Sequence, residues 1–237
     1  GCSNAYPLSL DITPSGGNLV YGFSCYTYGF PVGSLVNGTY LKVSADATTG
    51  VPLKLYSGQY PTLVGTRILA RTSDTTAGVQ DASSIGSDTF TNWISFTLDP
   101  GHLLNRSDAS ADGTIVASEV RNDSTIKIDR VIMSKWGAFG TNSYVDDCNL
   151  PISGDVVNPS VSQDGASVTW ADARGVLLAG TPAFNGPADC QLTRPPVVLA
   201  ATGTYPSYGP FNVPAPQPTK PVAPTVTIPK SLQLAAE

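Results

Sequence analysis

Apolar and polar residues alternate with a period of two along most of the chain, which is the pattern of β-strands with one buried face. Such strands are predicted at Tyr6–Ile12, Leu19–Cys25, Leu41–Ala45, Val51–Leu55, Phe90–Leu98, Thr125–Met133, Ser167–Trp170, Val176–Leu178 and Val197–Ala200. The phase of Thr125–Met133 shifts near Asp129, which predicts a β-bulge. Asn37-Gly38 is typical of a tight turn. No segment has helical spacing, so we expect an all-β sandwich or barrel.

The end of the chain has a different pattern. Residues 205–223 are Pro-rich and predict an extended linker, and residues 224–237 follow it as a C-terminal strand. The apolar residues of this strand share one face, namely Val226, Ile228, Leu232 and Leu234. Its prolines suit only a sheet edge. The strand therefore either folds back onto its own domain or is donated to the sheet of a neighbour.

Composition and charge exclude several functions. Only 13% of the 237 residues are charged, and Glu119 and Glu237 are the only glutamates among 18 acidic residues. A net charge of −5 with 13 scattered basic residues argues against nucleic-acid binding. No apolar run approaches the roughly 20 residues of a membrane span. His102 is the single histidine and no catalytic motif is present, so we expect a non-enzymatic protein.

The four cysteines predict an oxidising compartment. They are Cys2, Cys25, Cys148 and Cys190, and no CxxC pair occurs among them. Three disulfide pairings are open, of which we favour Cys2–Cys25 and Cys148–Cys190; four buried free thiols are the alternative. The chain begins at Gly1 without a signal peptide, as expected of a mature secreted chain. We therefore expect an extracellular or cell-surface location.

Three stretches together resemble carbohydrate-binding modules of families 4 and 9. The stretches are 38–47 (GTYLKVSADA), 92–97 (NWISFT) and 126–131 (IKIDRV). The resemblance implies a jelly-roll β-sandwich over residues 1–137. It also implies sugar binding through exposed aromatic side chains, for which Tyr26, Tyr28, Trp93 and Trp136 are the candidates, with packing against loops as the alternative. Residues 138–204 lie outside the resemblance and form either a second subdomain or the completion of the sandwich.

Residues 108–119 match the spacing of a 12-residue calcium loop. Oxygen ligands are predicted at Asp108, Ser110, Asp112, Thr114 and Glu119, with Gly113 at the sharp turn. Calcium prefers six to eight hard oxygen ligands, and this spacing wraps them around one point. A structural Ca²⁺ ion is one interpretation, and a solvated Asp/Ser turn between strands is the other.

These features favour an extracellular structural subunit that assembles with its own copies through edge strands. In outline it resembles calcium-dependent archaeal surface tubes (cannulae) and other filaments or arrays joined by donated strands. The first alternative is a carbohydrate-binding or adhesive module, for instance from a phage fibre or a cell-surface adhesin. The second is a viral capsid or decoration protein. We expect a homopolymer, with glycans as further candidate partners.

Overall fold

The computed structural model describes the backbone of residues 2–12, 18–27, 34–43, 54–56, 59–81, 90–137, 144–155, 157–186 and 188–203. Side chains are described from residue 59 onward within these ranges, except those of Asp81 and Val157. The described residues form strands and turns, and none of them lies in a helix. The prediction of an all-β protein is therefore confirmed.

Sixteen strands form four antiparallel sheets of four strands each within the described residues. Sheet A contains β1 (Cys2–Ile12), β2 (Asn18–Thr27), β3 (Ser34–Val43) and β4 (Lys54–Tyr56). Sheet B contains β5 (Gln59–Val64), β6 (Arg67–Arg71), β7 (Thr76–Asp81) and β8 (Thr91–Ser95). Sheet C contains β9 (His102–Ala109), β10 (Ile115–Asn122), β11 (Lys127–Trp136) and β12 (Tyr144–Asn149). Sheet D contains β13 (Val157–Val161), β14 (Ser167–Asp172), β15 (Gly175–Gly180) and β16 (Val197–Ala200).

Each sheet is a meander, because every pairing between named strands joins strands that are consecutive in the chain. A jelly roll needs Greek-key connections, in which a strand returns beside an earlier one. No such connection occurs among the described strands, so the β-sandwich is built by stacking meanders. The predicted boundary at residue 137 falls inside sheet C, since β12 pairs with β11 across it.

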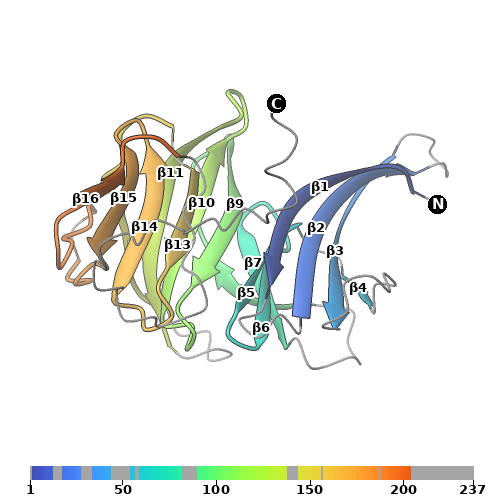
Figure 1. The fold of residues 1–237 in the computed structure, drawn as a ribbon, viewed down its shortest axis with the longest axis horizontal. Helices are drawn as coiled ribbons and strands as arrows, with labels where there is room; N and C mark the ends of the chain where they lie inside the picture. Colours follow the sequence, from blue (N-terminus) through green and yellow to red (C-terminus); the bar gives the residue numbers. More distant parts are fainter. Residues whose placement is uncertain are drawn as a thin grey trace, which may run out of the picture.

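Sheet C lies between sheets B and D, and each of its faces packs in a separate core (Figure 1). The B–C core includes Leu69, Trp93 and Ile94 of sheet B and Val116 and Trp136 of sheet C. The C–D core joins sheet C to sheet D through Val131, Met133, Val168, Trp170 and Leu177. On the far side of sheet B, strand β5 contacts β1 and β2 of sheet A. The result is a stack of sheets with β13–β16 at one end.

The register of the strands tests two predictions about local structure. Arg130 pairs with Val120 and Ile128 with Arg121, so Asp129 is the extra residue of a bulge, as predicted. The tight turn predicted at Asn37-Gly38 is wrong, because both residues lie inside β3 and pair with β2. Ladder pairing on the neighbouring strand overrides the local turn preference of this pair.

Several sequence predictions concern residues outside the description. Tyr28 and the C-terminal residues Val226, Ile228, Leu232 and Leu234 lie outside the described residues. Cys2, Cys25 and Tyr26 have a described backbone, but their side chains are not among those described. Their strands β1 and β2 are paired, with Cys25 opposite Ala5 and Cys2 opposite Thr27. The Cys2–Cys25 disulfide therefore stays a prediction.

Candidate functional site

Strand β16 is an outer edge of sheet D, and its apolar side chains are uncovered. It pairs with β15 on one side, and no described strand pairs with its other side. Val197, Val198 and Leu199 are 58%, 50% and 57% exposed, and Ala200 is exposed as well. Exposed apolar edge strands are sites where further strands add to a sheet, because their backbone N–H and C=O groups still need partners.

The other edge strands of the described sheets carry residues that discourage such pairing. Prolines occur in β1, β5 and β13, and charged residues occur in β4, β9 and β12. β8 has neither, but Thr91, Asn92 and Ser95 are exposed polar residues on it. β16 has none of these features, and no charged residue lies between Arg194 and Lys220. Native proteins use proline and charge to protect sheet edges, so β16 is the unprotected edge of this stack.

The core-facing side of sheet D ends at Val198 without a neighbour. In register, Trp170 lies opposite Leu177 and Leu177 lies opposite Val198, so the three side chains form one row on one face of the sheet. Trp170 is completely buried and Leu177 is 1% exposed, but Val198 is 50% exposed. The hydrophobic row therefore ends at β16, where no described strand covers Val198.

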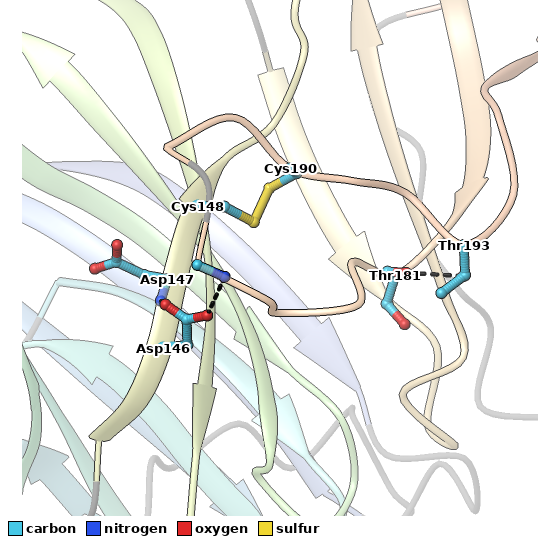
Figure 2. The surroundings of a disulfide bond; sticks show 7 residues. Asp146, Asp147, Cys148, Thr181, Cys190 and Thr193 are labelled. Atoms are coloured by element: carbon cyan, nitrogen blue, oxygen red, sulfur yellow. Dashed lines mark hydrogen bonds between the residues drawn. A yellow bond between two sulfur atoms is a disulfide. The ribbon is translucent and has the colours of Figure 1, made fainter.

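A disulfide ties the segment that connects β15 to β16 to strand β12 of sheet C (Figure 2). After β15 the chain runs out to β12, where Cys190 is bonded to Cys148 and the Gly186 N–H donates to the Asp146 carboxylate (3.0 Å). The Asn149 N–H donates to the Ala188 carbonyl (2.8 Å) and the Cys190 N–H donates to the Asn149 carbonyl (2.9 Å). Residues 181–194 are thereby attached to sheet C, and the predicted Cys148–Cys190 disulfide is confirmed.

The same segment then returns to sheet D through a second set of hydrogen bonds. The Thr193 hydroxyl donates to the Thr181 carbonyl (2.8 Å) and the Gly180 N–H donates to the Arg194 carbonyl (3.1 Å). Two glycines permit the close packing of this return. A Cβ on Gly180 would lie 2.2 Å from Thr193 Oγ1, and a Cβ on Gly175 would lie 2.2 Å from the Ala200 carbonyl oxygen. The position of β16 therefore depends on contacts with both sheets.

The residues of the predicted calcium loop form a β-hairpin instead of an open loop. Asp108 is the penultimate residue of β9, and Glu119 lies within β10. The turn between the two strands contains the other predicted ligands. In the turn, the Ser110 hydroxyl donates to Asp112 (2.6 Å), and the Thr114 N–H and hydroxyl donate to the same carboxylate (3.0 and 2.9 Å). Gly113 has a positive φ of 78°, as expected at the sharp turn.

The carboxylates of Asp108 and Glu119 are directed to strand β13 of sheet D. Asp108 accepts hydrogen bonds from the Ser160 hydroxyl (2.8 Å) and the Val161 N–H (2.9 Å). Glu119 accepts hydrogen bonds from the Asn158 N–H and from the Asn105 side-chain amide (both 2.6 Å). Among the described residues, no three His, Cys, Asp or Glu side chains gather into a group that could hold a metal ion.

Burial dominates the electrostatics of these two carboxyl groups. It raises the pKa of Asp108 and of Glu119 above their ordinary values, and the Arg106 guanidinium and the hydrogen bonds only partly offset it. In this arrangement the Asp108 and Glu119 side chains connect sheet C to sheet D by hydrogen bonds. Calcium binding stays a prediction, which melting curves with millimolar calcium and with EGTA test.

Trp93 and Trp136, the two candidates for sugar contact whose side chains are described, are buried. Trp136 is 5% exposed and packs against Trp93, Phe96 and Tyr144 at ring-centroid distances of 6.2, 6.4 and 5.5 Å. Trp93 is 3% exposed, although the alternation with Ile94 and Phe96 predicts an outward side chain. Ala77 pairs with Ile94 and Gly78 with Asn92, so Trp93 is the extra residue of a bulge. A bulge interrupts the alternation of faces, which explains why both Trp93 and Ile94 enter the B–C core.

Tyr144 is an exposed aromatic residue that the sequence patterns did not single out. It is 51% exposed on edge strand β12, and its ring packs edge-on against Trp136. Partial burial of its hydroxyl raises the pKa of Tyr144, and the nearby carboxylates of Asp147 and Asp146 raise it further. Only its aromatic character is visible in the sequence, since the exposure depends on how β12 pairs with β11.

Comparison with known proteins gave no relative. No protein-family model matches the chain, and no curated protein matches it significantly. The resemblance to carbohydrate-binding modules therefore stays an interpretation of three short motifs. Within the described residues, no helix is long and apolar enough to cross a membrane.

Proposed function

We propose that this protein is a non-enzymatic structural subunit of an extracellular assembly, in which copies are joined by strand addition at β16. The observation that carries the proposal is the uncovered edge of sheet D, where Val197, Val198 and Leu199 are each at least half exposed. A strand added there would gain ladder hydrogen bonds along β16 and would cover these side chains.

Covering these side chains contributes favourable free energy to such pairing. Complete burial of a valine or leucine side chain contributes about 1.5–3 kcal/mol, and three partly exposed ones lie on this edge. Protection of the other edges leaves β16 as the one acceptor edge among the described sheets, which favours ordered assembly over general aggregation. The Cys148–Cys190 disulfide and the low proportion of charged residues support an oxidising, extracellular setting.

A charge placed on the edge tests the proposal. We expect the unaltered chain to form large species in sedimentation velocity and regular particles in negative-stain microscopy. Val198→Lys should abolish both, because a lysine ammonium on the hydrophobic row would have to lose its hydration when a further strand pairs. Thr91→Lys, on the exposed and polar edge strand β8, is the matched control and should assemble normally.

Two results would contradict the proposal. The first is a wild-type chain that stays monomeric at all concentrations and ionic strengths in which it is soluble. The second is a Val198→Lys variant that assembles as well as Thr91→Lys, which would place the contact elsewhere on the molecule. Circular dichroism of each variant establishes that the substitution left the β-fold intact.

Tyr144 supports a second candidate function, glycan binding. Its exposed ring rests on Trp136, and exposed aromatic rings supported in this way provide platforms for the apolar faces of sugars. The Asp147 carboxylate near its hydroxyl provides a hydrogen-bond acceptor for sugar hydroxyl groups. Binding on a glycan array that disappears in Tyr144→Ala but persists in Val198→Lys would favour this function. If the wild-type chain binds no glycan on the array, glycan binding is excluded as its function.

A further inference from the structure

We infer that the strand added to β16 is the C-terminal segment Thr225–Ile228 of a second copy of this chain. The inference rests on the proposed function and specifies its partner. β16 has four residues, and its outer neighbour must supply an apolar side chain next to Val198 in the row that runs through Trp170 and Leu177. The partner must also lack charges at the contact, because the edge offers none to pair with.

The sequence of the C-terminal segment meets these requirements. Thr225-Val226-Thr227-Ile228 is four residues long, alternates threonine with an aliphatic residue, and is β-branched at every position. Pro224 and Pro229 bound it, which limits the paired length to that of β16. When Val226 or Ile228 takes the place beside Val198, the hydrophobic row gains a member and the half-exposed valine is covered.

The connection favours a second copy over the same chain. The described part ends at Gly203, three residues after β16, and residues 204–224, which include the Pro-rich stretch 205–223, separate this point from the segment. A return to the adjacent edge in a hairpin takes two to five residues. In the polyproline II form that prolines favour, a stretch of this length would span roughly 60 Å at ~3.1 Å per residue, far beyond the roughly 13 Å of a four-residue strand. The linker is therefore suited to bridging two molecules.

A complementation experiment with full-length variants tests the inference. Val198→Lys removes the acceptor edge and keeps the donor segment, and Ile228→Lys removes the donor and keeps the acceptor. We expect each variant alone to be monomeric. An equimolar mixture should form a 1:1 complex of twice the monomer mass and grow no further, because the complex retains no intact donor–acceptor pair. Gln217→Lys adds the same charge to the linker and should assemble like the wild type.

A peptide of residues 222–237 provides a second measurement that does not depend on the Val198 variant being folded. Fluorescence anisotropy should show saturable binding of this peptide to the Ile228→Lys chain, and at least a tenfold loss of affinity for the peptide with Val226→Lys. The inference is overturned if the wild type assembles but neither the mixture nor the peptide shows binding, and the proposed function then survives with another partner. It is also overturned if the wild type is monomeric and only deletion of residues 222–237 permits peptide binding, since the segment then covers its own edge.

Discussion

At the scale of single residues, Asp172 makes a contribution to the stability of the fold that is lost in acid. Its side chain has no exposed surface and accepts hydrogen bonds from Trp170 Nε1 (2.9 Å), the Ser153 N–H (3.1 Å) and the Arg174 guanidinium. Burial alone would raise its pKa, but these donors outweigh burial and lower the pKa from 3.8 to about 2. The ionised carboxylate therefore connects the β14–β15 turn to the segment that precedes β13.

We expect Asp172→Asn to be less stable than wild type at neutral pH, and we expect this difference in the free energy of unfolding to shrink in acid. A lowered pKa contributes stability that is present above pH 3.8 and is lost as pH falls toward 2. The shift corresponds to about 2 kcal/mol at neutral pH. Urea unfolding from pH 7 to pH 2 should show a destabilised variant whose deficit closes below pH 4. Asp155→Asn, in the exposed ion pair with Lys127, should change stability by less than about 1 kcal/mol throughout.

Glu119 gives a pH dependence of the opposite sign. Burial raises its pKa above 4.5, so its contribution is fully present below pH 4.5 and is lost as pH rises through the higher folded-state pKa. We expect Glu119→Gln to lose less free energy of unfolding than wild type as pH rises from 4.5 toward neutrality. The Asn105 amide can turn over to accept from the new glutamine. Parallel pH profiles of the two proteins in urea unfolding would contradict this prediction.

At the scale of elements, the junction of β15 and β16 depends on Gly175. Its φ is +112°, and a Cβ there would overlap the Ala200 carbonyl oxygen. Gly175→Ala should displace β16, lower the free energy of unfolding by about 1–3 kcal/mol and reduce assembly. Gly101→Ala is the matched control, because Gly101 also has a positive φ (+82°) but has open space around it. Equal assembly by the two variants would show that β16 tolerates the displacement.

The strands and their local irregularities were predictable to different degrees. Alternation located β14, β15 and β16, and the phase shift found the bulge at Asp129, because those strands have a periodic pattern that burial enforces. Alternation failed at Trp93, because a second bulge there directs both Trp93 and Ile94 into the B–C core. The Asp108–Glu119 spacing fits a calcium loop and a hairpin equally well. Only the position of β13, which is remote in sequence, determines where the two carboxylates are directed.

At the scale of the whole molecule, one disulfide joins sheet C to the return segment of sheet D. Cys148 and Cys190 are 42 residues apart and both are buried. Closing a loop of this length contributes about 4 kcal/mol in the chain-entropy model. The double variant Cys148→Ala/Cys190→Ala should therefore melt roughly 10 °C below wild type and assemble less well, because residues 181–194 lose an attachment that positions β16.

A control separates the two effects of this disulfide. Assembly should be measured well below the melting temperature of the double variant, where the chain is folded by circular dichroism. Reduced assembly under those conditions indicates that the disulfide positions the edge as well as stabilising the fold. Full assembly together with the lower melting temperature would limit its role to stability.

The route of residues 181–194 also sets an order of events in the life of the chain. These residues leave sheet D, are attached to β12, and come back before β16 begins. Strand β16 is consequently the last described strand to be synthesised, and its connection to β15 passes through the disulfide to β12. For the assembly proposed at β16, this route predicts that polymerisation starts only where the Cys148–Cys190 disulfide can form, which is an oxidising environment.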